Sequence, residues 1–397
     1  MKQVGILTYF WGTNPGTALQ AHSTLNLLQS HMPKANVEII NYQPKKVPRK
    51  YLLNYFHLTN SIRYHKLTSI YNAFRKNELH LREPSLISKD LIKASKFIGN
   101  RYDLISVGSD TVWEIRSLEH KNLAPFPNVY WLPPMIQAMK VSFSASADAT
   151  TLEQLDNATI DEMRAYLKGF DLIGVRDDMT QAITENLLDG GKGKVSRTPD
   201  PTFSYAIINA GAWNELAGIG LQKNKPIAAI NLPPMRGMRT KIIAHLQKNG
   251  YQVVSFNQVE DGKNIFYLPA LNPHQWAEVY KYFSLHITDR FHGTVFSLKN
   301  LTPVLAIDYS PIRITPQGDS KTYSLLKEFG LEKVAHLSYD TLEKNQDLLY
   351  NAIDRVISDY DSLQVKKKLV EMEDRCNHFA KEIADLLEGK NTNPNDD

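Results

Sequence analysis

The chain of 397 residues contains one cysteine and no long apolar run. Its single cysteine, Cys376, excludes an intrachain disulfide and argues against a cysteine-based metal site. No stretch approaches the roughly 18 consecutive apolar residues that a membrane-spanning helix needs. The N-terminus also lacks an apolar core followed by a small-residue cleavage site. We therefore expect a cytoplasmic protein with neither a secretory signal nor a membrane span.

Several signatures of familiar chemistry are also missing. The loop after the first predicted strand has neither a G-x-G-x-x-G fingerprint nor the Lys-Ser/Thr pair of a P-loop, which disfavours nucleotide binding by those two routes. No serine lies in a G-x-S-x-G elbow, so a serine hydrolase is disfavoured. No cluster of His, Asp or Glu has metal-ligand spacing, and no metal is expected.

What the sequence does contain is an alternation of predicted strands with longer amphipathic stretches. Five strands are predicted over 3–8, 37–40, 103–107, 140–144 and 171–175, and four more over 226–231, 252–256, 284–288 and 303–307. Such alternation indicates parallel sheets with helices on both faces. Because the chain exceeds what one hydrophobic core usually supports, the prediction is an α/β protein with two doubly wound, Rossmann-like domains facing a cleft.

The boundary between the two domains is predicted near residue 205. The Asp200–Thr202 segment ends the first group of strands, and alanine and glycine loosen the pattern over 203–222. The N-terminal domain would cover 1–205, with a basic insertion at about 44–100, and the C-terminal domain 206–388 with its C-terminal helices. Residues 389–397 are polar and are expected to form a flexible tail.

The segment Thr288–Ser297 combines a cation, an imidazole and a predicted helix start. Apolar residues 285–287 predict a buried strand, and the residues from Gly293 on predict the opening of a helix. Arg290 and His292 are therefore expected at a strand-to-helix turn, where the helix N-terminus favours an anion. The alternative is structural: the two side chains cap the helix or pair with Asp289.

A second notable segment, residues 45–96, is strongly basic. It contains twelve Lys or Arg and three Asp or Glu, so the rest of the chain is near −5 when the total is +4. Aromatic residues lie among the cations, a pattern compatible with nucleic acid, an anionic membrane or an acidic glycan. The alternative is a solvated helical face whose aromatic side chains turn inward.

Six short segments occur in an informative order: Gly12–Gln20, Tyr102–Trp113, Lys140–Ser146, Val175–Asp177, Asp200–Thr202 and Thr288–Ser297. They resemble the N-Y-G-A-x-L-Q, Y-D-x4-G-S-D-Q-V-W, K-x-S-Y-A-A-S, V-R-D/E, D-P-T and T-D-S-F-H-G-T-V-F-S segments of the polysaccharide pyruvyl transferase family. The resemblance runs from residue 3 to about residue 309. Thr111 stands where the family usually has Gln, and Glu114 where Asn is common.

The resemblance implies a transferase with a fold like that of the GT-B glycosyltransferases. Its reaction would move pyruvate from phosphoenolpyruvate to two hydroxyls of a sugar in a cell-surface polysaccharide or its lipid-linked precursor. The products would be a ketal and inorganic phosphate. Phosphoenolpyruvate is then a co-substrate, and no further cofactor is expected.

The resemblance also assigns donor-side residues. His292 matches the motif histidine and is the candidate for acid/base catalysis, since imidazole exchanges protons near neutral pH. Arg290 and Arg176 are candidates for catalysis and donor binding, because a guanidinium binds carboxylate and phosphate bidentately. The alternative for Arg176 is a salt bridge with Asp177 or Asp178. Further donor-binding candidates are Gly293, Thr294 and Arg313.

The acceptor side is expected to involve Asn14, Gly16, Ser109, Asp110 and Trp113. Sugars stack on tryptophan and form hydrogen bonds with Asp and Asn side chains. Two alternatives stay open, since Trp113 can equally pack in the core and Asp110 can cap a following helix.

Two rival functions remain at this stage. One is a GT-B glycosyltransferase that uses a nucleotide sugar, because an Arg and a helix N-terminus suit a diphosphate equally well. The other is a non-catalytic protein that binds glycan or nucleic acid. We expect an enzyme whose partners are phosphoenolpyruvate and a glycan or lipid-linked oligosaccharide, with no nucleic acid. It would act in the cytoplasm, with peripheral contact to anionic lipid at the inner face of the plasma membrane as a further hypothesis.

Overall fold

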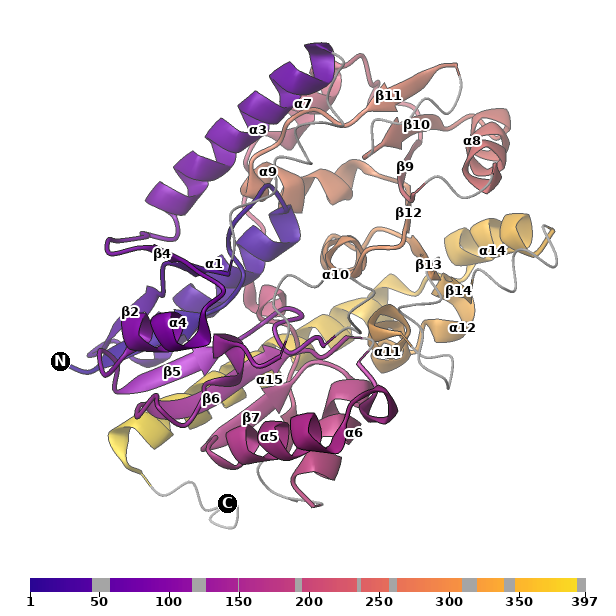
Figure 1. The fold of residues 1–397 in the computed structure, drawn as a ribbon. Helices are drawn as coiled ribbons and strands as arrows, with labels where there is room; N and C mark the ends of the chain where they lie inside the picture. Colours follow the sequence, from indigo (N-terminus) through magenta and orange to yellow (C-terminus); the bar gives the residue numbers. More distant parts are fainter. Residues whose placement is uncertain are drawn as a thin grey trace. The chain divides into compact units, whose positions relative to one another are not determined.

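A computed structural model describes residues 1–44, 58–115, 126–148, 150–189, 195–233, 237–256, 263–308, 320–338 and 347–390. It divides into two compact α/β units, Met1–Tyr205 with Met372–Asp397, and Ala206–Glu371 (Figure 1). The last part of the C-terminal helix therefore groups with the first unit, which corrects the assignment of 206–388 to one domain. The cleft expected between the domains stays a prediction.

The first unit is built on a six-stranded parallel sheet with the order β2-β1-β5-β6-β7-β8. Its strands are β1 (Gln3–Leu7), β2 (Asn36–Ile39), β5 (Leu104–Val107), β6 (Met139–Ala145), β7 (Leu172–Val175) and β8 (Val195–Arg197). The register of β6 with β7 shifts between Ser142 and Ala145. At this irregularity Ser144 has a φ of 54°, and the strand changes which face its side chains reach.

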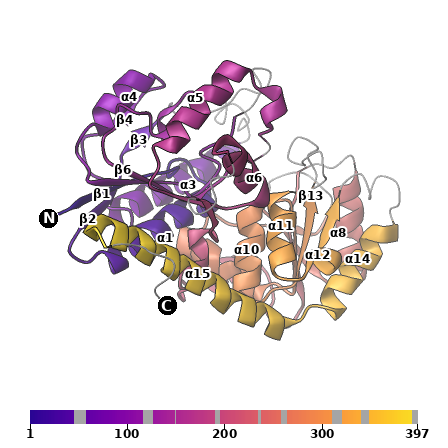
Figure 2. The same ribbon diagram turned by 90° about the horizontal axis from the view of Figure 1, so that it is seen from below.

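Helices cover both faces of this sheet. Figure 2 shows α4 (Leu91–Ile98) and α5 (Asn157–Lys168) on one side, with α1 (Pro15–His31) and α15 (Ser362–Glu388) on the other. The unit also contains α3 (Leu58–Asn77), α6 (Asp178–Leu187) and a short parallel pair, β3 (Tyr42–Gln43) with β4 (Leu86–Ile87). α15 packs on the sheet through Phe379, whose ring lies 5.1 Å from that of Phe143. Gly174 of β7 permits this approach, since a Cβ there would lie 2.6 Å from the Phe379 ring.

The second unit has six parallel strands in the order β11-β10-β9-β12-β13-β14. They are β9 (Ile227–Asn231), β10 (Gln252–Ser255), β11 (Ile265–Tyr267), β12 (Leu285–Thr288), β13 (Val304–Asp308) and β14 (His336–Ser338). Helices accompany them: α7 (Ala212–Gly218), α8 (Met238–Lys248), α9 (Pro273–Glu278), α10 (Phe291–Lys299), α11 (Lys321–Glu328), α12 (Glu332–Ala335) and α14 (Asp347–Ser358). Numbered within the unit, the strand order is 3-2-1-4-5-6, that of a Rossmann fold.

All nine strands predicted from the sequence are present, and each end lies within one residue of its predicted position. The short strands β8, β11 and β14 were not predicted. Each of them lies at an edge of its sheet and has only three residues. Three residues are too few to show an apolar period. Within the described residues, no helix is long and apolar enough to cross a membrane.

Candidate functional site

The predicted donor segment follows β12, which lies at the switch point of the second sheet. β12 pairs with β9 on one side and β13 on the other, and the strand order reverses between β9 and β12. In doubly wound sheets, ligands bind outside the carboxyl ends of the strands at such a point. The topology thus places Arg290 and His292 where this fold class binds its ligands.

Arg290 is the N-cap residue of α10, and no side chain caps that helix. The helix begins at Phe291, two residues before the predicted opening, so His292 belongs to its first turn. Arg290 Nε lies 3.0 Å from Asp289 Oδ1, and 48% of the Arg290 side chain is exposed. The pairing with Asp289 is therefore present, but about half of the cation still faces solvent. Together with the positive end of the helix dipole, it favours an anion here.

A buried histidine, His286 of β12, stabilises this turn through hydrogen bonds that involve Ser297 and Gly293. Ser297 Oγ donates to Gly293 O at 2.8 Å and lies 2.7 Å from His286 Nδ1. Because Ser297 Oγ donates its only proton to Gly293 O, it must act as the acceptor toward His286. His286 Nδ1 is therefore protonated and is the donor of that hydrogen bond. Burial lowers the pKa of His286 to about 3, so the ring is neutral. Sequence reasoning missed this residue, although a histidine inside an apolar strand is the signal.

Gly293 and Thr294 have structural roles in the same turn. A Cβ on Gly293 would lie 3.1 Å from His286 Cε1 and 3.1 Å from Thr288 Oγ1, a tight contact that would require the neighbours to move by a few tenths of an ångström. Thr294 is fully buried, and its hydroxyl donates to Arg290 O at 3.2 Å. The hydroxyl of Thr294 thus stabilises the first helical turn, and its role in donor binding stays a prediction.

A cluster that sequence reasoning did not identify lies at the end of the neighbouring strand β13. Asp308 Oδ2 accepts a hydrogen bond from Ser320 Oγ and lies 2.6 Å from His336 Nε2. The Asp308 and His336 side chains are each 10% exposed. Arg313, the remaining donor-side candidate, lies outside the described residues.

On the first sheet, the loops after β1 and β5 flank the corresponding switch point, since β1 pairs with β2 on one side and with β5 on the other. Asn14 Oδ1 caps α1 by accepting from Gly16 N at 3.0 Å and Thr17 N at 3.4 Å. Asp110 Oδ2 accepts from Thr17 Oγ1 at 3.1 Å. Asp110 therefore ties the β5 loop to α1, and no described helix begins at it. Asn14 is exposed and Asp110 half-buried.

Arg176, at the end of β7, is held in a buried ion pair. Its Nη1 donates to Asp200 Oδ2 at 3.0 Å, and the two side chains are 2% and 0% exposed. Burial alone would lower the pKa of Arg176, but Asp200, Asp110 and Asp177 outweigh it and raise the pKa. The ion pair is thus formed with Asp200, and the charge of Asp177 also acts on this guanidinium. Arg176 has a structural role in this buried setting, and its role in catalysis and donor binding stays a prediction.

Ser109 belongs to the same buried network. Its hydroxyl lies 2.9 Å from Asp200 Oδ2 and 3.1 Å from Ser144 O, and the residue is fully buried. Asp200 Oδ1 accepts from Thr202 N and Thr202 Oγ1 at 3.0 and 2.7 Å. The prediction that Ser109 contacts the acceptor is therefore corrected. This network instead joins the ends of β5, β6 and β8 in the first sheet.

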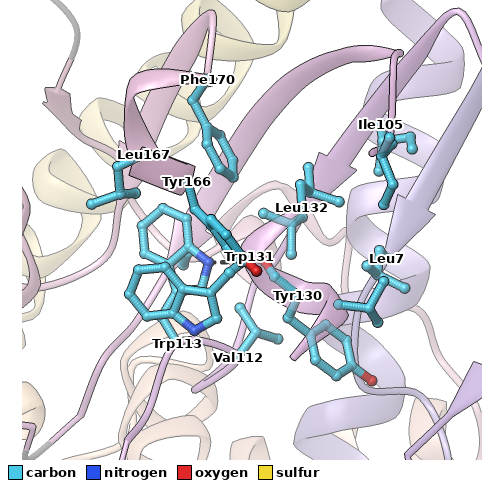
Figure 3. Packing of buried hydrophobic residues seen from close by; sticks show 14 of the residues in the cluster. Leu7, Ile105, Val112, Trp113, Tyr130, Trp131, Leu132, Tyr166, Leu167 and Phe170 are labelled. Carbon is cyan, nitrogen blue, oxygen red and sulfur yellow. Dashed lines mark hydrogen bonds between the residues drawn. The ribbon is translucent and has the colours of Figure 1, made fainter. Parts of the chain in front are cut away.

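Trp113 lies in the core of the first unit. It is 1% exposed and stacks on Trp131 at a ring distance of 5.1 Å, and Phe170 meets it edge-on (Figure 3). Its Nε1 donates to Tyr130 O at 3.0 Å. The prediction of a sugar-stacking surface at Trp113 is wrong, and the alternative of core packing holds.

Two other aromatic side chains follow β1 at the same edge of the sheet. Tyr9 and Trp11 are both half-buried, with ring centroids 4.9 Å apart. Burial, and next the charges of Asp110 and Glu114, raise the pKa of Tyr9 well above its ordinary value. Tyr9 therefore lies close to Asp110. Sequence reasoning passed over this pair, although both residues stand in the segment that carries Gly12.

The basic segment is described only from residue 58 onward. In α3, Tyr71 and Phe74 are 2% and 5% exposed, whereas Lys66 and Lys76 are exposed. Arg75 Nη1 donates to Gly12 O at 2.7 Å, which ties α3 to the loop after β1. Tyr71, Phe74, Lys66 and Lys76 thus agree with the alternative of inward aromatic residues and solvated cations, whereas Arg75 is bonded to the backbone; the partner of this segment stays a prediction. Residues 45–57, with Tyr51 and Tyr55, lie outside the described residues.

The polysaccharide pyruvyl transferase family model matches residues 14–311. The chain belongs to this family. It is an enzyme family, and the match covers Asn14, the Arg176 and Asp200 network and the Arg290–His292 turn. A search of curated proteins finds no match.

Solved structures with a similar fold include UDP-N-acetylglucosamine 2-epimerases. One such enzyme has a TM-score of 0.56 and 12% identity, with 100% of this chain and 98% of that chain covered. The enzyme from Rickettsia bellii has a TM-score of 0.52 and 8% identity, with 98% of each chain covered. The Methanocaldococcus jannaschii enzyme, solved with UDP-GlcNAc and UDP, has a TM-score of 0.50 and 12% identity, covering 98% and 100%. These likenesses show a fold of the GT-B type.

In the part of the chain that the structure describes, no group of three or more His, Cys, Asp or Glu side chains could hold a metal ion. Each unit carries its own set of candidate residues, at the switch point of its own sheet. One set has Arg290 and His292, and the other has Asn14, Asp110, Tyr9 and Trp11.

Proposed function

We propose that this family member transfers pyruvate from phosphoenolpyruvate to two hydroxyls of a sugar, forming a ketal and releasing phosphate. The observation that carries the proposal is the Arg290–His292 turn, which lies within the family match and at the switch point of the second sheet. An exposed cation and a helix N-terminus there suit a substrate with both a carboxylate and a phosphate.

His292 is proposed as the general acid and base. In the first step it protonates the methylene carbon of phosphoenolpyruvate, which leaves an electron-poor centre at the adjacent carbon. A sugar hydroxyl attacks this centre and gives up its proton, and His292 can accept it. A second hydroxyl of the same sugar then displaces the phosphate, which takes up the proton of that hydroxyl, and the ketal closes. The charge on the departing phosphate is stabilised by Arg290 and the N-terminus of α10.

The acceptor is proposed to contact the loops after β1 and β5. Asn14 is exposed and Asp110 half-buried, so each can form hydrogen bonds with sugar hydroxyls. Tyr9 and Trp11 take over the stacking role that Trp113 cannot perform. We propose further that the acceptor is a cell-surface polysaccharide or its lipid-linked precursor, modified in the cytoplasm at the inner face of the plasma membrane.

The test combines phosphoenolpyruvate with a panel of sugar-diphosphate-lipid and nitrophenyl glycoside acceptors, and follows phosphate release and acceptor mass together. The wild type should add about 70 Da, the mass of pyruvate less water, while His292→Ala should lower the rate about 10²–10⁴-fold by losing the general acid. His378→Ala is the matched control, because its side chain is 75% exposed on α15. It should react like the wild type.

Two results would contradict the proposal. Full activity in His292→Ala would remove this residue from the mechanism. Turnover of a nucleotide sugar, without any reaction of phosphoenolpyruvate, would favour a glycosyltransferase on the same fold.

A further inference from the structure

We propose that the outer face of α4 binds the surface of an anionic lipid bilayer. Lys89, Ile92, Lys93 and Lys96 are all exposed. Within α4, Lys96 follows Ile92 by four residues and Lys93 by three, which places these three side chains on one face. Lys89 precedes the helix, next to its N-cap Asp90. The opposite face, with Ala94, Ser95 and Ile98, is buried in the first unit. We call Lys89, Ile92, Lys93 and Lys96, together with Ile87, the α4 surface.

The α4 surface carries apolar side chains as well as cations. Ile87 is 45% exposed and Ile92 is 56% exposed. Ile87 ends β4, and Figures 1 and 2 both show β4 beside α4 on the outside of the first unit. The α4 surface thus exposes three lysines and two isoleucines. This combination matches the interfacial region of a bilayer, where apolar side chains enter the acyl boundary and cations stay among anionic headgroups.

The isoleucines favour a bilayer over an acidic glycan or nucleic acid. A soluble polyanion offers partners for the lysines but none for an exposed branched alkyl group.

This inference does not depend on the proposed reaction, because lipid binding needs no donor or acceptor. If the proposed acceptor is lipid-linked, the α4 surface would bring the first unit to the membrane that holds it. A protein that binds vesicles yet lacks pyruvyl transfer would leave the inference standing and overturn the reaction alone.

The experiment is co-sedimentation of the full chain with vesicles of phosphatidylcholine, with and without phosphatidylglycerol, at low and high salt. Binding should require phosphatidylglycerol and weaken with salt. Lys93→Glu/Lys96→Glu should lower the partition coefficient about tenfold or more, because each cation near an anionic surface adds substantially to binding. Ile92→Ser should lower it severalfold without changing the charge.

The control variant is Lys327→Glu/Lys333→Glu, which makes the same charge change at exposed positions of the second unit. It should bind like the wild type. Equal loss in this control and in Lys93→Glu/Lys96→Glu would show a nonspecific charge effect and overturn the proposal. Unchanged vesicle binding in Ile92→Ser, with equal binding to a soluble anionic polysaccharide, would assign the surface to a glycan and overturn it too.

Discussion

Arg176 and Arg290, both candidates for donor binding from the sequence, differ in how deeply they are buried. Arg176 is 2% exposed in its side chain and paired with Asp200, whereas Arg290 is 48% exposed although it contacts Asp289. Removing one partner of a buried ion pair leaves the other charge unpaired inside the protein. A substitution of Arg176 should therefore lower the stability of the fold. Arg290 can still turn toward an anion, because a half-exposed pair is weak.

The buried imidazole of His286 should make the fold sensitive to acid. Its pKa is lowered from 6.5 to about 3 by burial, so the unfolded chain takes up the proton first as pH falls. The stabilising effect of the neutral ring is complete above about pH 6.5, and about 2 kcal/mol of it is lost by pH 5. Urea unfolding at pH 7 and pH 5 measures this loss.

His286→Asn is the informative variant, because its amide can still donate toward Ser297 but does not titrate. The drop in unfolding free energy from pH 7 to pH 5 should be about 2 kcal/mol smaller in this variant than in the wild type. The exposed His378→Asn should leave the drop unchanged. An equal drop in His286→Asn and the wild type would show that His286 does not cause the acid sensitivity.

At the level of elements, the packing of α10 on β12 depends on a single glycine. In Gly293→Ala, the new Cβ would meet His286 Cε1 and Thr288 Oγ1, each at 3.1 Å. The neighbouring side chains or the helix must then move by a few tenths of an ångström, and we expect a cost of about 1–3 kcal/mol of stability. Gly218→Ala in α7 is the matched control, since its Cβ would meet no atom within 4 Å. It should stabilise the fold by about 0.5–1 kcal/mol. Thermal melts of both variants compare the two effects, and equal stability would contradict the contact.

The accuracy of the element predictions follows from how each strand is buried. Strands in the middle of a parallel sheet are covered on both faces, so they appear as continuous apolar runs such as 227–231 and 304–308. β8 and β14 contain polar residues and form no such run, and the apolar run of β11 is only three half-buried residues long. The start of α10 was placed two residues late because Arg290 is not a typical capping residue.

For the whole molecule, α15 is the element that belongs to both units. It begins at Ser362 in the second unit and from Met372 onward groups with the first. Phe379 anchors it, being 2% exposed against Phe143 and Gly174. Phe379→Ala should destabilise the first unit by about 3–5 kcal/mol through the cavity it leaves. Hydrogen exchange should then accelerate in β6 and β7 more than in β9 and β12.

Val370→Ala is the control on the same helix. Its side chain is 60% exposed, so the change should stay within about 0.5 kcal/mol. Equal acceleration of exchange in both sheets of Phe379→Ala would mean that the two units unfold together, against the expectation for separate cores.

The sequence by itself determined the fold class, the central strands and the Arg290–His292 turn. These depend on apolar runs, strand-to-helix order and local motifs, all of which are read along the chain. Only the tertiary structure decided that Trp113 packs on Trp131, that Asp200 encloses Arg176 and Ser109, and that α15 ends in the first unit. Each of these is a contact between residues 18 or more positions apart. The physical reason is that the burial of a side chain depends on which distant segments pack against it. The local periodicity of a sequence indicates a helix or a strand but not the segment that packs on it.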